Sequence, residues 1–209
     1  MVKDGNQEKN VQSTKSNGLL FAAETISMVE ETAEIFFYSG INPSSILKLN
    51  SMISQMSHKL LQKVMLPKSR ELAVSVIQPI TLHINSLGGW FTSGMAGMDS
   101  ILNCSVPVST IIEGEACSAA TLLSIAGAHR VIHRHSLVMI HQLSSWAAGT
   151  YENIKAEFHN IEKMQQMLRA VYLERTKLPE KLLDKTLLKK DVYLSAKESL
   201  KYGIVDEII

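Results

Sequence analysis

Residues 80–125 read ITLHINSLGGWFTSGMAGMDSILNCSVPVSTIIEGEACSAATLLSI, and this stretch decides the fold. Short apolar segments of strand type alternate in it with segments of helical spacing, and the turns fall at Gly88-Gly89 and Gly114-Glu115. The pattern predicts strand, helix, strand and helix, over residues 80–86, 95–102, 108–112 and 117–125. Because strands that alternate with helices usually pair in parallel, we predict an α/β fold.

The sequence before this stretch continues the alternation. A strand over 35–38 precedes a helix that begins at Asn42-Pro43, where the missing N–H of proline costs nothing. Steps of three and four give that helix one apolar stripe, formed by Ile46, Leu49, Ile53, Met56 and Leu60. Residues 66–78 are harder to interpret, because 72–77 fits either a strand or a short insertion.

The sequence after residue 125 predicts three strands and three helices. Two short strands are expected over 130–133 and 136–141, followed by a long helix over 151–174. One face of that helix is apolar, with Ile154, Phe158, Ile161, Met164, Leu168 and Val171. A shorter helix begins at Leu178-Pro179, and a capping-box pair, Ser195 and Glu198, starts the last one before a strand over 205–209.

Length and composition narrow the class of protein. The chain has 209 residues, 45% of them hydrophobic, which fits one globular domain over 18–209 after a polar arm over 1–17. With 21 basic and 20 acidic residues, no bulk charge favours nucleic acid. No apolar run is long enough for a membrane span, and no secretory signal is present. Two cysteines cannot build a disulfide framework, so we expect a reducing, cytoplasmic location.

Ser118 is the first candidate for chemistry. It follows a strand and a glycine turn and stands at the start of a small, apolar helix. Unpaired backbone N–H groups at such a place can hold the oxyanion that forms in acyl transfer. The segment alone also fits a serine that merely caps the helix. Cys117 is a rival nucleophile, although a small buried cysteine explains it equally.

His141 ends an apolar strand, at the edge where α/β folds usually place their sites, although a satisfied core histidine gives the same pattern. The paired glycines at 88 and 89 also end a strand, and their N–H groups are candidate oxyanion donors. The histidines lack metal-site spacing and no phosphate-binding glycine loop is present, so we expect no metal and no cofactor.

Four segments in order resemble the proteolytic subunit of the Clp protease, ClpP. They are INSLGG, GEACS with its apolar helix, MIHQ, and DVYLSAKESLKYGIVDEII, against family wording close to INSPGG, GQAASMG, MIHQP and an Asp-aromatic-Leu-Ser-Ala ending. The likeness covers residues from about 35 to the C-terminus. It implies the ββα spiral that ClpP shares with crotonases, with a protruding handle helix over 151–174.

The resemblance also implies roles for individual residues. Ser118 stands at the family's nucleophile, His141 at the general base and Asp191 at the acid that orients the histidine. The backbone N–H groups of Gly89 and Ala119 stand at the oxyanion hole. Without the resemblance, Asp191 fits a solvated loop carboxylate beside two lysines.

The implied function is that of a serine endopeptidase subunit. Its family forms two stacked heptameric rings around the active sites and receives unfolded proteins from an ATPase that unfolds them. Organellar and viral members exist besides the cytoplasmic ones. Two other functions fit the same residues: a catalytically silent subunit of a mixed ring, and an acyl-CoA enzyme of the crotonase type.

This chain departs from the family pattern in several places. Leu87 replaces a proline before the glycines, and Ala119-Ala120 replace Met-Gly after the nucleophile position. Residues 144–148, Ser-Ser-Trp-Ala-Ala, replace a Gly-rich stretch beside the expected substrate strand. Residues 66–78 are longer than the family's connection, and residues 1–34 show no likeness. Substrate preference and binding of an ATPase therefore depend on segments where this chain differs.

Overall fold

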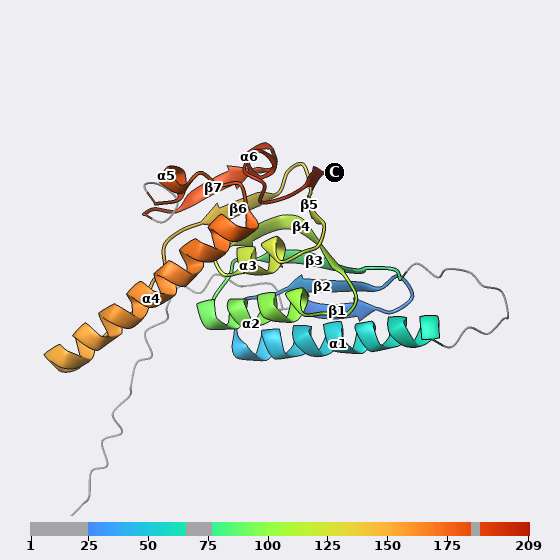
Figure 1. Ribbon diagram of the computed structural model, residues 1–209, viewed down its shortest axis with the longest axis horizontal. Helices are drawn as coiled ribbons and strands as arrows, with labels where there is room; N and C mark the ends of the chain where they lie inside the picture. Colours follow the sequence, from blue (N-terminus) through green and yellow to red (C-terminus); the bar gives the residue numbers. More distant parts are fainter. Residues whose placement is uncertain (1–24, 66–76, 185–188) are drawn as a thin grey trace, which may run out of the picture.

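One mixed sheet of eight strands organises the chain (Figure 1). The structure is a computed structural model that describes residues 25–65, 77–184 and 189–209. The strands are β1 (Thr25–Val29), β2 (Glu34–Tyr38), β3 (Ile80–Ser86), β4 (Val108–Cys117), β5 (Arg130–Ile132), β6 (Leu137–Ile140), β7 (Val192–Ser195) and β8 (Glu207–Ile208). The helices are α1 (Pro43–Met65), α2 (Phe91–Leu102), α3 (Ala120–Ile125), α4 (Tyr151–Arg175), α5 (Glu180–Leu182) and α6 (Ala196–Lys201).

The strand order is β1-β2-β3-β4-β5-β8, and β6 pairs with both β4 and β7. The pairs along β2, β3, β4, β5 and β8 are parallel, as predicted. The β1–β2 and β6–β7 pairs are antiparallel, which the alternation of strands and helices did not predict. This topology agrees with the predicted α/β fold class.

Strand β4 is longer than predicted, because it continues through the expected turn. Gly114 bends the strand with a φ of 89° without ending it, and Ser136 Oγ accepts a hydrogen bond from its N–H at 2.8 Å. Before the bend β4 pairs with β5, and after the bend it pairs with β6. Helix α3 consequently begins at Ala120 rather than at Cys117. This switch of partners places Ser118, which follows β4, beside strand β6.

Helices α1 and α2 run side by side along the sheet (Figure 1). The predicted stripe on α1 is confirmed, since all five of its apolar residues are buried. Strand β1 was missed, because it is short and most of its residues are exposed, so it lacks a clear apolar pattern. Two other interpretations, the polar arm over 1–17 and the ambiguous stretch at 66–76, lie outside the described residues.

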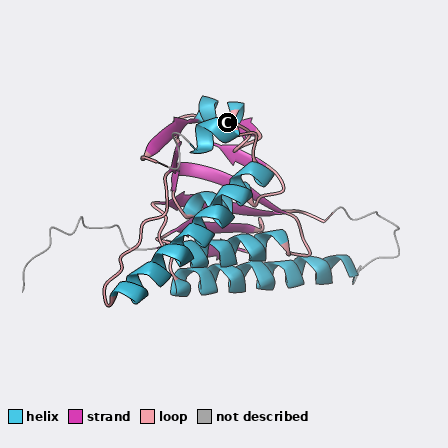
Figure 2. Ribbon diagram, turned by 60° about the vertical axis from the view of Figure 1, so that its left-hand side comes forward, coloured by secondary structure: helices cyan, strands magenta, loops and turns pink. Residues whose placement is uncertain are grey.

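Helix α4 protrudes from the body of the molecule (Figures 1 and 2). It begins where the Thr150 side chain accepts a hydrogen bond from the Asn153 N–H. Only its C-terminal part is buried, at Leu168 and Tyr172, whereas Phe158 is 59% exposed. The predicted apolar face therefore packs on the body only in its second half. No described helix is both long and apolar enough to span a membrane.

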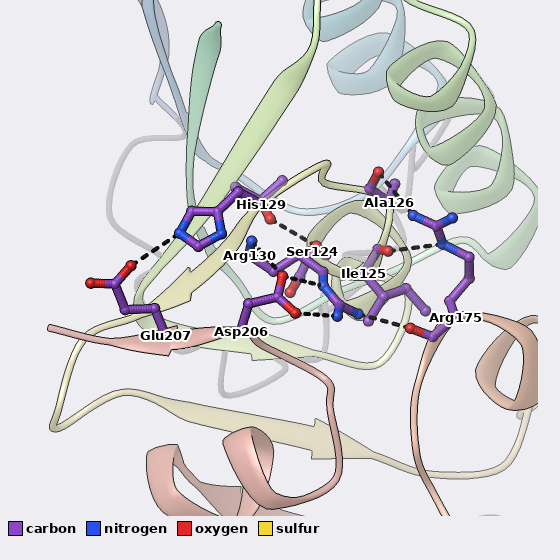
Figure 3. A network of polar contacts seen from close by, with 9 residues as sticks. Ser124, Ile125, Ala126, His129, Arg130, Arg175, Asp206 and Glu207 are labelled. Atoms are coloured by element: carbon purple, nitrogen blue, oxygen red, sulfur yellow. Dashed lines mark hydrogen bonds and ion pairs between the residues drawn. The ribbon is translucent and has the colours of Figure 1, made fainter.

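Hydrogen bonds of two arginines connect the end of α4 to Asp206 near the C-terminus and to the end of α3 (Figure 3). The Arg130 guanidinium donates to both carboxylate oxygens of Asp206 and to the carbonyl oxygen of Arg175. Arg175 donates to the carbonyl oxygens of Ile125 and Ala126, at 3.2 and 3.5 Å. These carbonyls end α3 and have no partner within that helix, so the cation satisfies them.

This network predicts how stability depends on pH. The hydrogen bond from Arg130 lowers the pKa of Asp206 below its usual range, although partial burial opposes the effect. A carboxyl whose pKa is lower in the folded state stabilises the fold above its unfolded pKa, and this contribution is lost as pH falls through the folded pKa. We expect Asp206→Asn to lower Tm at pH 7, with a difference from wild type that shrinks below about pH 4. Glu207→Gln is the control, because the Glu207 side chain pairs with the exposed His129 within the part of the chain that the structure describes. Thermal melts of this variant across pH 3–7 should show the Tm of the wild type.

Candidate active site

Ser118 lies on the tight turn between β4 and α3. Its φ is +53°, a conformation that non-glycine residues rarely adopt and that persists only when its surroundings hold it. The Ser118 N–H donates to Met139 O at 2.8 Å, and Ser118 O accepts from Thr121 N–H at 3.0 Å. The residue at the cap position of α3 is Ala119, and no side chain caps this helix. Ser118 is therefore not a helix cap, and its hydroxyl is turned to another partner.

That partner is His141, the residue after β6. The distance from His141 Nε2 to Ser118 Oγ is 2.6 Å, within hydrogen-bond range. The register of β4 and β6 explains this contact. Cys117 pairs with Met139, so Ser118 and His141, which lie one and two positions beyond this pair, come to the same edge of the sheet. His141 is partly exposed rather than enclosed in the core, so the alternative of a satisfied core histidine does not describe its position.

Asp191 completes the predicted set from the start of β7. Strands β6 and β7 are antiparallel, and Ile140 lies opposite Val192. His141, which follows Ile140, therefore lies opposite Asp191, which precedes Val192. His141 Nδ1 and Asp191 Oδ1 are 3.7 Å apart, which is an ion-pair distance but too long for a hydrogen bond. The Asp191 side chain is 73% exposed, so water screens its interaction with the histidine.

The two predicted glycines lie directly against the serine turn. Gly88 has a φ of 88°, and a Cβ on it would be 2.4 Å from Cys117 O and 2.9 Å from Ser118 Cβ. Gly89 has a φ of 147°, and a Cβ on it would be 2.1 Å from Ile41 O. Both positions therefore require glycine for conformation and for space.

Two backbone N–H groups beside Ser118 are free to bind a ligand. Within the described part of the chain, neither the Gly89 N–H nor the Ala119 N–H donates to a protein acceptor. Neighbouring groups are paired, since Ile41 N–H donates to Gly88 O and Trp90 N–H donates to Ile41 O. Free donors at the edge of a pocket are what an oxyanion hole requires.

Ser86 was not singled out from the sequence, yet it holds the glycine loop. Its hydroxyl donates to Ser39 O at 2.6 Å and accepts from Gly88 N–H at 3.2 Å. These bonds replace part of the rigidity that a proline at position 87 would supply, while Leu87 itself is exposed. No local pattern could identify this role, because the partner Ser39 is 47 positions away in the sequence.

A cavity of about 610 Å³ opens beside Ser118 and His141. Residues of α4 line it together with polar residues of the segment after β6 and with Trp90. The apolar and aromatic α4 residues in the lining are Ile161, Met164, Leu168 and Tyr172. A volume in this range, with an apolar lining and a few polar groups, is typical of a ligand-binding cleft.

Cys117 is not a plausible rival for Ser118. It is fully buried, and burial together with the neighbouring Glu115 carboxylate raises the pKa of its thiol to about 12. A thiol with such a pKa stays neutral at pH 7 and is a poor nucleophile. Among the described residues no group of three His, Cys, Asp or Glu side chains is placed to hold a metal ion.

Comparisons with known proteins identify the family to which this fold belongs. The sequence model of the Clp protease family matches residues 29–209, so the chain belongs to that family rather than to the acyl-CoA enzymes. In structure, the chain is similar to a ClpP1 mutant from Listeria monocytogenes, with a TM-score of 0.71 and 24% sequence identity. This match covers 86% of the chain and 92% of the Listeria chain, and it shows the common fold.

Proposed function

We propose that this protein is a serine endopeptidase subunit in which Ser118 is the nucleophile, His141 the general base and Asp191 the orienting acid. The observation that carries the proposal is the 2.6 Å contact between Ser118 Oγ and His141 Nε2, beside two free N–H donors. A nucleophile within hydrogen-bond reach of a base, which in turn faces a carboxylate, is the arrangement that acyl transfer needs.

The mechanism follows from these positions. His141 Nε2 takes the proton of the Ser118 hydroxyl while Oγ attacks the scissile carbonyl carbon. The Gly89 and Ala119 N–H groups stabilise the oxyanion of the tetrahedral intermediate. The histidine then gives its proton to the leaving amine as the peptide bond breaks. In the second half of the reaction His141 takes a proton from water, which attacks the acyl carbon, and gives it to Ser118 Oγ as the ester bond breaks.

Labelling with a fluorophosphonate probe tests the nucleophile. We expect the wild type to carry one covalent adduct on Ser118 by mass spectrometry, and Ser118→Ala to carry none. Cys117→Ala is the matched control, since it removes the adjacent, neutral thiol and should label like wild type. A wild type that stays unlabelled in its assembled form would indicate a catalytically silent subunit, and labelling of Ser118→Ala would assign the nucleophile elsewhere.

We propose further that the subunit works inside a ring. Helix α4 exposes several large apolar side chains along its length, among them Ile154 at 45%, Phe158 at 59% and Met167 at 51%. A solvated helix gains nothing from such residues, and burial between subunits would stabilise them. Rings of this family stack in pairs and enclose the sites, and an ATPase that unfolds proteins would supply the substrate.

Sedimentation velocity tests this assembly. We expect a species much larger than the 23.2 kDa chain at micromolar concentration. Phe158→Lys should shift the population toward small species, because it would bury a charge at the contact. Lys163→Ala, elsewhere on the same helix, is the control and should assemble like wild type. A wild type that sediments as a monomer at all concentrations contradicts the ring.

A further inference from the structure

A buried chain of hydroxyl groups connects α4 to the backbone of Ser118. Tyr172 on α4 is 1% exposed, and its hydroxyl lies 2.5 Å from Thr121 Oγ1. Thr121, which is fully buried in α3, donates from Oγ1 to Ser118 O at 2.6 Å. A carbonyl oxygen can only accept, so the threonine proton is committed to it and Tyr172 must donate to Thr121. Burial raises the pKa of Tyr172 to about 12, which keeps this donor protonated.

The group at the end of this chain belongs to a functional peptide unit. Ser118 C=O and Ala119 N–H are parts of the same planar peptide, so any rotation of the carbonyl also turns the N–H. The plane follows a residue with a φ of +53°, a conformation that its surroundings must hold. The Ser118 carbonyl accepts from both Thr121 groups, the N–H at 3.0 Å and the hydroxyl at 2.6 Å.

We propose that Thr121 and Tyr172 are positioning residues that aim the Ala119 N–H at the oxyanion, by fixing the Ser118–Ala119 peptide plane. The inference rests on the proposed function for the role of that N–H. The hydroxyl chain itself is a feature of this structure whichever reaction the site performs. Neither residue touches the reacting atoms through its hydroxyl.

If Thr121 and Tyr172 only stabilised the fold, removing another buried hydroxyl contact of α3 would affect kcat as much as removing theirs. Helix α3 has a second hydroxyl contact of the same kind at its other end, where Thr110 Oγ1 donates to Ser124 O at 2.8 Å. Thr110 is also fully buried, and its contact lies beside the carbonyls that Arg175 holds rather than beside Ser118. Thr110→Val therefore removes an equivalent hydrogen bond from the same helix and serves as the matched control.

The variants separate positioning from stability. Loss of an oxyanion donor typically costs about 10²–10³ in kcat, so a loosened donor should cost less. We expect Thr121→Val to lower kcat about 10-fold with KM within about 2-fold of wild type, and Tyr172→Phe to lower kcat about 3-fold. Thr121→Ser keeps the hydroxyl and should restore kcat to within about 2-fold of wild type. Thr110→Val should lower Tm but leave kcat unchanged.

The double variant Thr121→Val/Tyr172→Phe gives a sharper test. Thr121→Val alone leaves the buried Tyr172 hydroxyl without a partner, which lowers stability, and removing that hydroxyl as well should recover part of the Tm. We expect kcat to stay low in the double variant, because the Ser118 carbonyl is still not held by a hydroxyl. If kcat recovers together with Tm, or if Thr121→Val loses no more activity than Thr110→Val, the positioning role is wrong.

A readout that needs no turnover keeps the two proposals distinct. Hydrogen–deuterium exchange of the peptide spanning residues 116–124 should be faster in Thr121→Val than in wild type, and unchanged in Thr121→Ser. If the wild type neither labels nor hydrolyses peptides, the proposed function fails, and the exchange experiment still decides whether the hydroxyl chain holds the turn. Equal exchange in Thr121→Val and wild type overturns the inference in either case.

Discussion

Replacing His141 with alanine is expected to lower kcat for peptide hydrolysis about 10⁴-fold, whereas Asp191→Ala should lower it only about 10²-fold. The histidine effect is large because no other base in the described chain lies within hydrogen-bond reach of Ser118 Oγ. Without a base the serine hydroxyl remains a weak nucleophile at neutral pH. The residual rate should come from the oxyanion donors and from substrate binding.

The smaller effect of Asp191 follows from its surroundings. The carboxylate is 3.7 Å from His141 Nδ1, and 73% of its side chain is exposed. Water can therefore replace part of its interaction with the imidazolium, which a buried carboxylate would not allow. Steady-state kinetics of both variants should be compared with His129→Ala, a histidine in a surface ion pair that should retain wild-type kcat. Equal losses at His141 and Asp191 would mean that the carboxylate closes on the histidine when substrate binds.

Gly88→Ala is expected to slow fluorophosphonate labelling of Ser118 at least 10²-fold and to lower Tm. A left-handed φ costs a non-glycine residue about 1–2 kcal/mol, and here the new Cβ would also be 2.4 Å from Cys117 O. Since Cys117 O is backbone, the clash can be relieved only by moving the serine turn away from the glycine loop. That movement would separate the Ser118 hydroxyl from the oxyanion donors.

Gly149→Ala separates the clash from the strain. Gly149 also has a positive φ, of 132°, but the atoms nearest to a Cβ on it would be side-chain atoms of Asn153, at 3.2 Å or more. We expect this variant to lose some stability and to label at the wild-type rate. If both variants label equally fast, the glycine loop tolerates a side chain and does not set the geometry of the site.

The sequence predicted those parts of the fold whose signals are local. The stripe on α1 repeats every three or four residues, and the capping box of Ser195 and Glu198 lies within one turn of helix, and both are confirmed. The continuation of β4 through Gly114 was missed, because a glycine that bends a strand has the same sequence signature as one that ends it. The projection of α4 followed from the family resemblance and not from the apolar face of the helix, because such a face indicates burial without showing what covers it.

For the candidate site, the order of motifs brought Ser118, His141 and Asp191 to attention, and the structure places them together. Composition and spacing alone left each of them with an ordinary structural explanation. Thr121 and Tyr172 could not be found in this way, because their hydrogen bond joins positions 51 residues apart. Such contacts depend on how α4 packs on α3, which no short pattern encodes.

Strand β4 pairs with β5 before Gly114 and with β6 after it, and this order bears on the stage of synthesis at which the proposed site can form. The nucleophile and the glycine loop come from β3 and β4, whereas the base and the acid come with β6 and β7. Ribosomal synthesis delivers Ser118 first, and the histidine follows 23 positions later. Until β6 joins β4 beyond Gly114, the growing chain holds Ser118 without His141 beside it, so the proposed active site can form only after this part of the sheet has closed.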